Sequence, residues 1–332
     1  MSLPPRGARH FGALGAWGRA VAGGLLCLVL TPGTSSAASG DVASVPSAQC
    51  LTATRAASVV QLLELTGVFE RARTETAGVV ERLRLDNPKV LTEFWKSFTD
   101  RVAARDVRIG LYVPIYTGHL SPEDVCVVLN FYRTPIGAYL IKVTPEIQQE
   151  TRVAAQAWAS NVAIDLLDPD EDSQGAHASH SFPPEPATVL AAGHVAAVHE
   201  FLKVSGTLAA AQQMMGETLD RLRQGPQAST LPASFWDHAR KRLSEESDLL
   251  RLWTPAYANK LTETQTRELI RFYTSAPGAR YVAALPVIRS ESLNAGAQLG
   301  RDAAKRAVHE VYGPLPQWRM LHPPTSTATA PN

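Results

Sequence analysis

Apolar residues recur at helical spacing along most of the chain. Within residues 122–133 they fall at positions i, i+3, i+4 and i+7, which are Val125, Val128, Leu129 and Tyr132. Within residues 263–274 the last three of these positions hold Leu269, Ile270 and Tyr273. This spacing places the apolar side chains on one face of a helix, and no stretch shows the sustained alternation typical of strands. The pattern predicts an all-α protein.

The polar residues around these segments mark where helices begin and end. Ser121 followed by Pro122 predicts one helix start, and Thr262 with Gln265 predicts a capping box at another. Pro135 and the Pro277-Gly278 pair are expected to end these two helices. A short helical piece should follow each of them, halted by Pro145 or Pro286, and then a long helix. Residues 56–84 and 189–223 suit two helices each.

The chain repeats itself at an offset of 141 residues. Residues 120–150 align with 261–291 without a gap, and eight of the 31 positions are identical, where average composition predicts about two. The identical positions of the first segment are Leu120, Phe131, Tyr132, Gly137, Ala138, Pro145, Ile147 and Glu150. Their counterparts are Leu261, Phe272, Tyr273, Gly278, Ala279, Pro286, Ile288 and Glu291.

This repetition predicts two tandem homologous helical-bundle domains, which we call the first repeat (residues 52–168) and the second repeat (188–312). Residues 169–187 between them are acidic and then rich in proline, which is typical of a solvated linker. Residues 39–51 and 313–332 are expected to be a disordered N-terminal segment and a disordered tail.

The repeated motif also resembles a known family. Each copy has a helix cap, an apolar helix, a Phe-Tyr pair, a Gly-containing turn and a later proline, as in LSPEDVCVVLNFYRTPIGAYLIKVTP and LTETQTRELIRFYTSAPGARYVAALP. This looks like the bacterial domain of unknown function family 2059. The second copy departs by one register at its turn, with Ala276 where Pro135 stands and Pro277 where Ile136 stands. The resemblance implies exported helical proteins with no assigned activity, and it carries over no catalytic residue.

Residues 1–38 have the three parts of a secretory signal peptide. Arg6, Arg9 and Arg19 precede or border an apolar run of eleven residues, Ala20 to Leu30, and Ser36-Ala37-Ala38 fits a cleavage site. The run is too short to span a membrane, and no later stretch approaches eighteen apolar residues. We therefore expect export, most readily to the periplasm of a Gram-negative bacterium, with cleavage after Ala38 and no transmembrane segment in the mature protein.

The net charge limits the possible partners, and the cysteines allow one disulfide. The formal net charge is +1, and removal of the three signal-peptide arginines makes it −2, so we expect no nucleic-acid partner held by bulk charge. Cys27 leaves with the signal peptide. The remaining Cys50 and Cys126 either form one disulfide in an oxidising compartment or are two buried free thiols.

No residue pattern predicts a catalytic, metal or cofactor site. His177 and His180 are three residues apart and His194 and His199 are five apart, and neither spacing matches a helical zinc pair. No nucleophile elbow is present, and no phosphate-binding loop lies outside the signal peptide.

Two repeated features still leave alternatives open. Glu150 and Glu291 flank the apolar stripe, where they could do acid–base work with raised pKa values, or each could anchor its helix by bonding a neighbour such as the hydroxyl of Tyr132 or Tyr273. The two Phe-Tyr pairs could line a ligand pocket, although core packing is the more frequent reason for such pairs.

Three functional hypotheses follow. The first is an uncharacterised exported helical protein that acts as a non-catalytic interaction or binding module of the cell envelope, with an unidentified envelope protein or small ligand as partner. The second is a periplasmic binder of a small apolar or envelope-derived ligand. The third is a hydrolase that uses Glu150 or Glu291.

Overall fold

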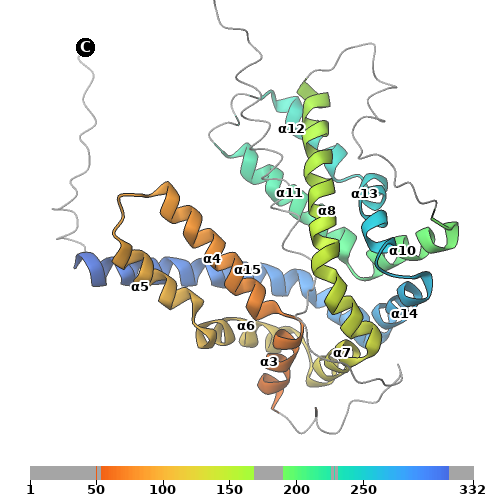
Figure 1. Ribbon diagram of the computed structural model, residues 1–332, viewed down its shortest axis with the longest axis horizontal. Helices are drawn as coiled ribbons and strands as arrows, with labels where there is room; N and C mark the ends of the chain where they lie inside the picture. Colours follow the sequence, from red (N-terminus) through yellow and green to blue (C-terminus); the bar gives the residue numbers. More distant parts are fainter. Residues whose placement is uncertain (1–49, 51–53, 168–189, 226–227, 229–230, 314–332) are drawn as a thin grey trace, which may run out of the picture. The chain divides into compact units, whose positions relative to one another are not determined.

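The computed structural model describes residues 50, 54–167, 190–225, 228 and 231–313 (Figure 1). Within these residues the protein holds twelve α-helices and no strand, which confirms the all-α prediction. The predicted signal peptide, the linker at 169–187, the N-terminal segment except Cys50, and the tail beyond Gly313 lie outside the described residues.

The two repeats match helix for helix. The helices of the first repeat are α3 (Arg55–Leu65), α4 (Val68–Asp86), α5 (Thr92–Ala103), α6 (Arg105–His119), α7 (Pro122–Arg133) and α8 (Pro135–Leu167). Those of the second are α10 (Ala192–Val204), α11 (Thr207–Arg223), α12 (Ala233–Leu243), α13 (Glu246–Ala258), α14 (Glu263–Thr274) and α15 (Ala276–Tyr312). The offset of 141 residues carries α7 onto α14 with identical bounds.

The predicted helix caps form. The Ser121 hydroxyl accepts a hydrogen bond from the backbone N–H of Asp124 at 3.0 Å, which satisfies one of the free donors at the start of α7. Thr262 accepts from the backbone N–H of Gln265 at 3.2 Å, and the Gln265 side chain accepts in return from the N–H of Thr262. This second arrangement is the capping box that the sequence predicts for α14.

Helices α7 and α14 end at Arg133 and Thr274, just before the prolines that were expected to end them. The predicted stops at Pro145 and Pro286 were wrong. Pro135 is the first residue of α8, where its missing N–H costs nothing. Pro145 lies inside α8, and Pro286 lies inside α15. Each internal proline removes one backbone hydrogen bond, but apolar residues on both sides of Pro145 are buried, namely Leu140, Ile141, Val143 and Ile147. Burial of this face keeps α8 continuous although one backbone hydrogen bond is missing at Pro145.

The chain divides into two compact units that do not follow the repeat boundaries. Among the described residues, unit 1 is Val127–Ala283, and unit 2 joins the part up to Cys126 to the part from Ala284 onward. Unit 1 therefore combines α8 and most of α7 from the first repeat with α10 to α14 of the second. Unit 2 combines α3 to α6 of the first repeat with most of α15 from the second. The repeat boundaries at 52–168 and 188–312 instead place each long helix with the other helices of its own repeat.

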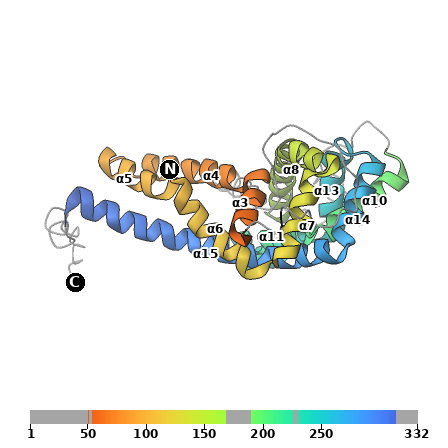
Figure 2. The same cartoon turned by 90° about the horizontal axis from the view of Figure 1, so that it is seen from below.

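In unit 2 the C-terminal part of α15 lies along the helices of the first repeat (Figure 2). One apolar cluster joins α4 and α5 to α15, and its buried members are Val80, Trp95, Phe98, Val102, Ala303 and Ala307. The two alanines allow the aromatic rings of α5 to pack close to the α15 backbone. Polar contacts border this cluster, since Glu310 accepts a hydrogen bond from Ser97 and forms an ion pair with Arg101, both at 2.7 Å.

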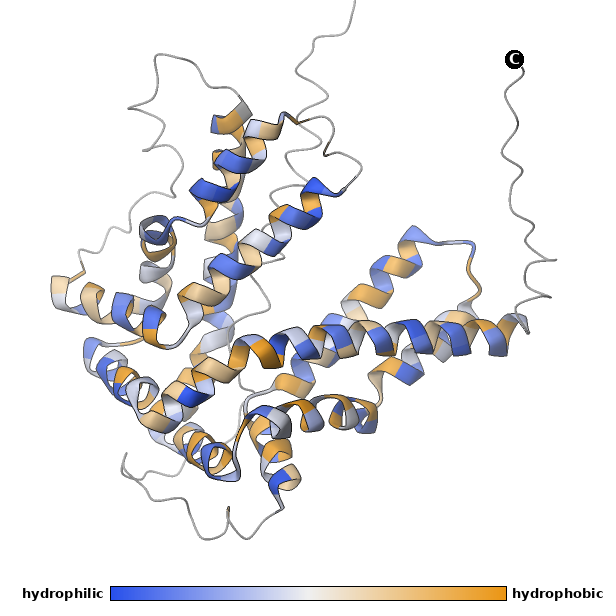
Figure 3. Cartoon of the chain, turned by 180° about the vertical axis from the view of Figure 1, so that it is seen from behind, coloured by the Kyte–Doolittle hydropathy of each residue, from blue (hydrophilic) through white to orange (hydrophobic). Residues whose placement is uncertain are grey.

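In unit 1 the long helix α8 packs against α12 and α13 of the second repeat (Figure 1). Its buried face includes Trp158, which is fully enclosed. The facing helix α12 buries Phe235 and Trp236, the counterparts of Phe94 and Trp95 in α5. Orange apolar residues and blue polar residues share most helices, as amphipathic packing requires (Figure 3).

Candidate functional site

The repeated motif builds the same hydroxyl-capped turn in both repeats. Thr134 lies between α7 and α8, donates a hydrogen bond to the carbonyl of Phe131 at 2.7 Å and accepts one from the N–H of Gly137 at 3.2 Å. Ser275 does the same between α14 and α15, with the carbonyl of Phe272 at 2.6 Å and the N–H of Gly278 at 3.2 Å. One side chain thus caps the C-terminal end of one helix and the N-terminal end of the next.

The glycine of this turn is required by a close backbone approach. A Cβ atom at Gly137 would lie 2.1 Å from the carbonyl oxygen of Phe131, and a Cβ at Gly278 would lie 2.1 Å from that of Phe272. Real Cβ atoms do not come this close to backbone atoms. The glycine therefore lets the Phe-Tyr end of each apolar helix press against the start of the next helix.

The Phe-Tyr pairs that precede these two turns contact each other. The rings of Phe131 and Phe272 are stacked, with centroids 3.6 Å apart and planes 2° from parallel. The hydroxyl oxygens of Tyr132 and Tyr273 lie 3.2 Å apart and share a hydrogen bond. All four residues are buried and all lie in unit 1. In this unit the motif of one repeat meets the same motif of the other.

The aromatic cluster continues into the second repeat. The ring of Phe201 in α10 lies 5.8 Å from the rings of both Tyr257 and Tyr273. Burial raises the pKa of Tyr273 well above its usual range, with further contributions from Tyr132, and burial likewise raises the pKa of Tyr257. These phenols therefore stay protonated and act as hydrogen-bonding core groups. The rings fill the space between helices by packing on one another.

The repeated glutamate of the first repeat is paired with a cation from the second. The Lys260 ammonium lies 3.2 Å from a carboxylate oxygen of Glu150 and 2.6 Å from one of Glu146. The hydrogen bond and charge of Lys260 lower the pKa of Glu146, and the two glutamates raise the pKa of Lys260. The Glu150 side chain is 43% exposed, so water reaches this pair. The backbone of Lys260 is also held, because Tyr139 donates a hydrogen bond to its carbonyl at 2.8 Å.

The glutamate of the second repeat has the reciprocal partner. In unit 2, His119 Nε2 lies 3.0 Å from a carboxylate oxygen of Glu291. His119 and Lys260 are 141 positions apart, as are Glu150 and Glu291. The position of His119 and Lys260 therefore contacts the position of Glu150 and Glu291 in two places. In each place, one of the two residues comes from each repeat. Each glutamate thus contacts a neighbour, as one of the two alternatives from the sequence had it, and the neighbour is Lys260 or His119.

Lys260, His119 and Glu146 are the residues that sequence reasoning missed. A signal was present, since His119 and Lys260 directly precede the repeated Leu120 and Leu261. Lysine or histidine at one matching position and glutamate at another indicate polar contacts between the repeats.

Leu120 and Leu261 are buried, and the backbone of each bonds a side chain from the first helix of its repeat. The backbone carbonyl of Leu120 accepts a hydrogen bond from Arg55 at the start of α3. The carbonyl of Leu261 accepts from Nε2 of His194 in α10, at 2.7 Å. His194 therefore has a structural role, and His177 and His180 lie outside the described residues. In the part of the chain that the structure describes, no cluster of three or more metal-ligating side chains occurs.

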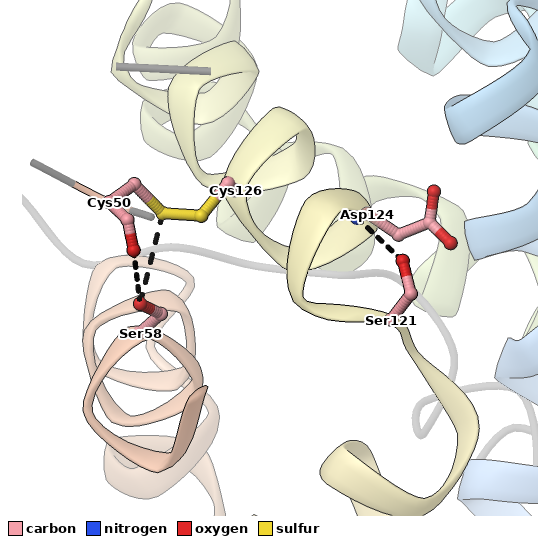
Figure 4. The surroundings of a disulfide bond; sticks show 5 residues. All are labelled: Cys50, Ser58, Ser121, Asp124 and Cys126. Atoms are coloured by element: carbon pink, nitrogen blue, oxygen red, sulfur yellow. Dashed lines mark hydrogen bonds between the residues drawn. A yellow bond between two sulfur atoms is a disulfide. The ribbon is translucent and has the colours of Figure 1, made fainter. Parts of the chain in front are cut away.

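Cys50, in the segment ahead of the first repeat, forms a disulfide with Cys126 of the first repeat (Figure 4). It joins Cys50, ahead of α3, to Cys126 in the first turns of α7, and both residues are buried. The Ser58 hydroxyl lies 3.7 Å from Sγ of Cys50 and donates a hydrogen bond to the Cys50 carbonyl at 3.5 Å. Of the two alternatives left open by the sequence, the structure has the disulfide.

Comparison with known families adds one finding. Residues 109–164 and 247–306 match the model of a family described as an uncharacterized protein conserved in bacteria, DUF2059. Each repeat carries one DUF2059 region. The first region runs from within α6 to within α8 and the second from within α13 to within α15, so each includes the capped turn, the Phe-Tyr pair and the repeated glutamate. No curated protein and no solved structure matches the chain.

The helices were also compared with the dimensions of a membrane. None of the helices in the described part of the chain is both long enough and apolar enough to cross a bilayer.

Proposed function

We propose that this protein is an exported, non-catalytic interaction module of the bacterial cell envelope. The observation that best supports export to an oxidising compartment is the disulfide between Cys50 and Cys126. Disulfides persist in oxidising compartments such as the periplasm and are rare in the bacterial cytosol. The signal-peptide pattern of residues 1–38 independently supports the same compartment.

The use of the motif residues supports a role in assembly over one in catalysis. The Phe-Tyr pairs are occupied by packing and by one another's hydroxyl groups. Glu150 contacts Lys260 and Glu291 contacts His119, so each glutamate has a partner in the other repeat. A hydrolase needs a second polar group that converges with its acid on one substrate, whereas Lys260 and His119 contact these glutamates in pairs that join the repeats.

Export is tested by expressing the full chain in a Gram-negative bacterium. We expect a periplasmic product that begins at Ser39, with no free thiol before reduction. A variant with Leu26→Arg, which interrupts the apolar run, should keep its N-terminus and stay in the cytoplasm. A wild-type product with an intact N-terminus and two reduced cysteines in the cytoplasm would contradict the proposal.

The non-catalytic role is tested by activity screens on envelope-derived substrates, such as peptidoglycan fragments and lipid esters. The variants are Glu150→Gln and Glu291→Gln, with the exposed Glu93→Gln as the matched control. We expect no turnover by any of the four proteins. Turnover by the wild type that is lost in Glu150→Gln or Glu291→Gln, while both variants keep their helical signal, would favour the hydrolase instead.

A further inference from the structure

We infer that the two repeats are held together by a homotypic interface, so that the partner this surface fits is a second copy of the same repeat. Covalent connection through residues 168–189 is then not needed to keep the repeats together. This inference concerns assembly and does not depend on the proposed envelope function.

The first step is that two positions of the motif meet their own counterparts. Phe131 stacks on Phe272, and the hydroxyl of Tyr132 bonds that of Tyr273, so residue i contacts residue i+141 in both cases. Contact of a position with itself is what an isologous interface produces at its centre. Two unrelated surfaces within one chain have no reason to meet in this register.

The second step is that the polar contacts at two other positions are reciprocal. In an isologous interface, a contact between position x of one partner and position y of the other must recur with the partners exchanged. Here Lys260 contacts Glu150, and His119 contacts Glu291. These are the same two positions with the repeats exchanged, and a nitrogen-bearing side chain contacts the glutamate in both cases.

The third step is that each long helix completes the bundle of the other repeat. Helix α8 packs on α12 and α13 of the second repeat, and α15 packs on α5 of the first. The buried faces of α8 and α15 are therefore each covered by helices of the other repeat. A repeat separated from its partner would expose Trp158 or the aromatic rings of Trp95 and Phe98.

The fourth step is that nothing covalent besides the linker joins the two repeats. The disulfide joins the first repeat to the segment that precedes it, and no cysteine follows Cys126. Cleavage between residues 168 and 189 therefore yields two fragments with no covalent tie, each of which contributes helices to both compact units.

The experiment is to place a protease site within residues 168–189 of the full chain, fold the protein and then cleave it. Size-exclusion chromatography with light scattering should show both fragments eluting together at the mass of one intact chain. Two separate species after complete cleavage under native conditions would overturn the inference.

Variants then locate the interface in the cleaved protein. Phe131→Ala should weaken fragment association about 30-fold or more, because a buried stacked ring at an interface centre is lost. Lys260→Ala should weaken it about fivefold, as expected for a partly exposed ion pair. The matched control is Lys203→Ala, whose ion pair with Glu246 lies within the second repeat, and it should leave the affinity unchanged. Fragment affinity that is equal to wild type in both Phe131→Ala and Lys260→Ala would also overturn the inference.

Discussion

The hydroxyl oxygens of Tyr132 and Tyr273 lie 3.2 Å apart, and these residues are separated by 141 positions, the offset of the internal repeat. Both side chains are buried, so each hydroxyl depends on partners within the protein. The hydrogen bond therefore joins the two repeats through the same residue of each.

This bond predicts coupled effects of substitution. Tyr132→Phe and Tyr273→Phe should each lower the free energy of unfolding by about 1 kcal/mol, because each removes one partner of a buried hydrogen bond. The double variant should lose less than the sum, since the shared bond is lost only once. Denaturant unfolding of the four proteins measures this coupling. Tyr312→Phe, in unit 2, is the control and should combine additively with Tyr132→Phe; additivity of the Tyr132 and Tyr273 variants would refute the pairing.

The glycines of the two capped turns give a second prediction. Gly137→Ala and Gly278→Ala should each destabilise the protein by about 3 kcal/mol, because the added methyl group meets a backbone carbonyl. Gly110→Ala in α6 is the control, since nothing lies within 4 Å of its Cβ position, and it should be neutral or stabilising. Thermal unfolding distinguishes them, and equal effects at Gly110 and Gly137 would disprove the close approach.

The disulfide gives a third prediction. It closes a loop of 76 residues, so its loss should lower the free energy of unfolding by about 4 kcal/mol on the chain-entropy model. The double variant Cys50→Ser/Cys126→Ser and the reduced wild type should show the same loss in urea unfolding. A variant that unfolds at the same urea concentration as the oxidised wild type would show that the bond adds no stability.

The fourth prediction concerns pH. The hydrogen bond from Ser97 and the charge of Arg101 lower the pKa of Glu310 below its usual value of 4.5. Because its pKa is lower in the folded state, Glu310 contributes stability above pH 4.5, and this contribution disappears as the pH falls through the folded-state pKa. Glu310→Gln should therefore be less stable than the wild type at pH 7 and equally stable in strong acid. Glu93→Gln serves as the control, and a difference between Glu310→Gln and wild type that is constant with pH would contradict the mechanism.

Much of the fold follows from local sequence. The caps at Ser121 and Thr262 and the helical spacing before Tyr132 are encoded within a few residues, so pattern reasoning finds them. Their recurrence at one offset also revealed the repeat. The prolines were misjudged because local propensity argues for a stop at Pro145, whereas burial of the surrounding apolar face keeps α8 continuous.

The partners of the motif residues could not be predicted in the same way. An apolar stripe on α8 or α15 fits helices of its own repeat and of the other repeat equally well, because the two repeats carry the same pattern. The choice depends on contacts between residues more than a hundred positions apart, such as Glu150 with Lys260. The local pattern around each glutamate is compatible with several neighbours, so it does not specify the contact with the other repeat.

The most direct test of contact between the repeats uses two native ion pairs. A carbodiimide joins a lysine to a carboxylate only when the two are in contact. Mass spectrometry of the monomeric product should find Lys260 linked to Glu146 or Glu150, which belong to the other repeat. Lys203 and Glu246, 2.6 Å apart within the second repeat, are the internal control. Recovery of the Lys203–Glu246 link without any link from Lys260 to the first repeat would contradict the account.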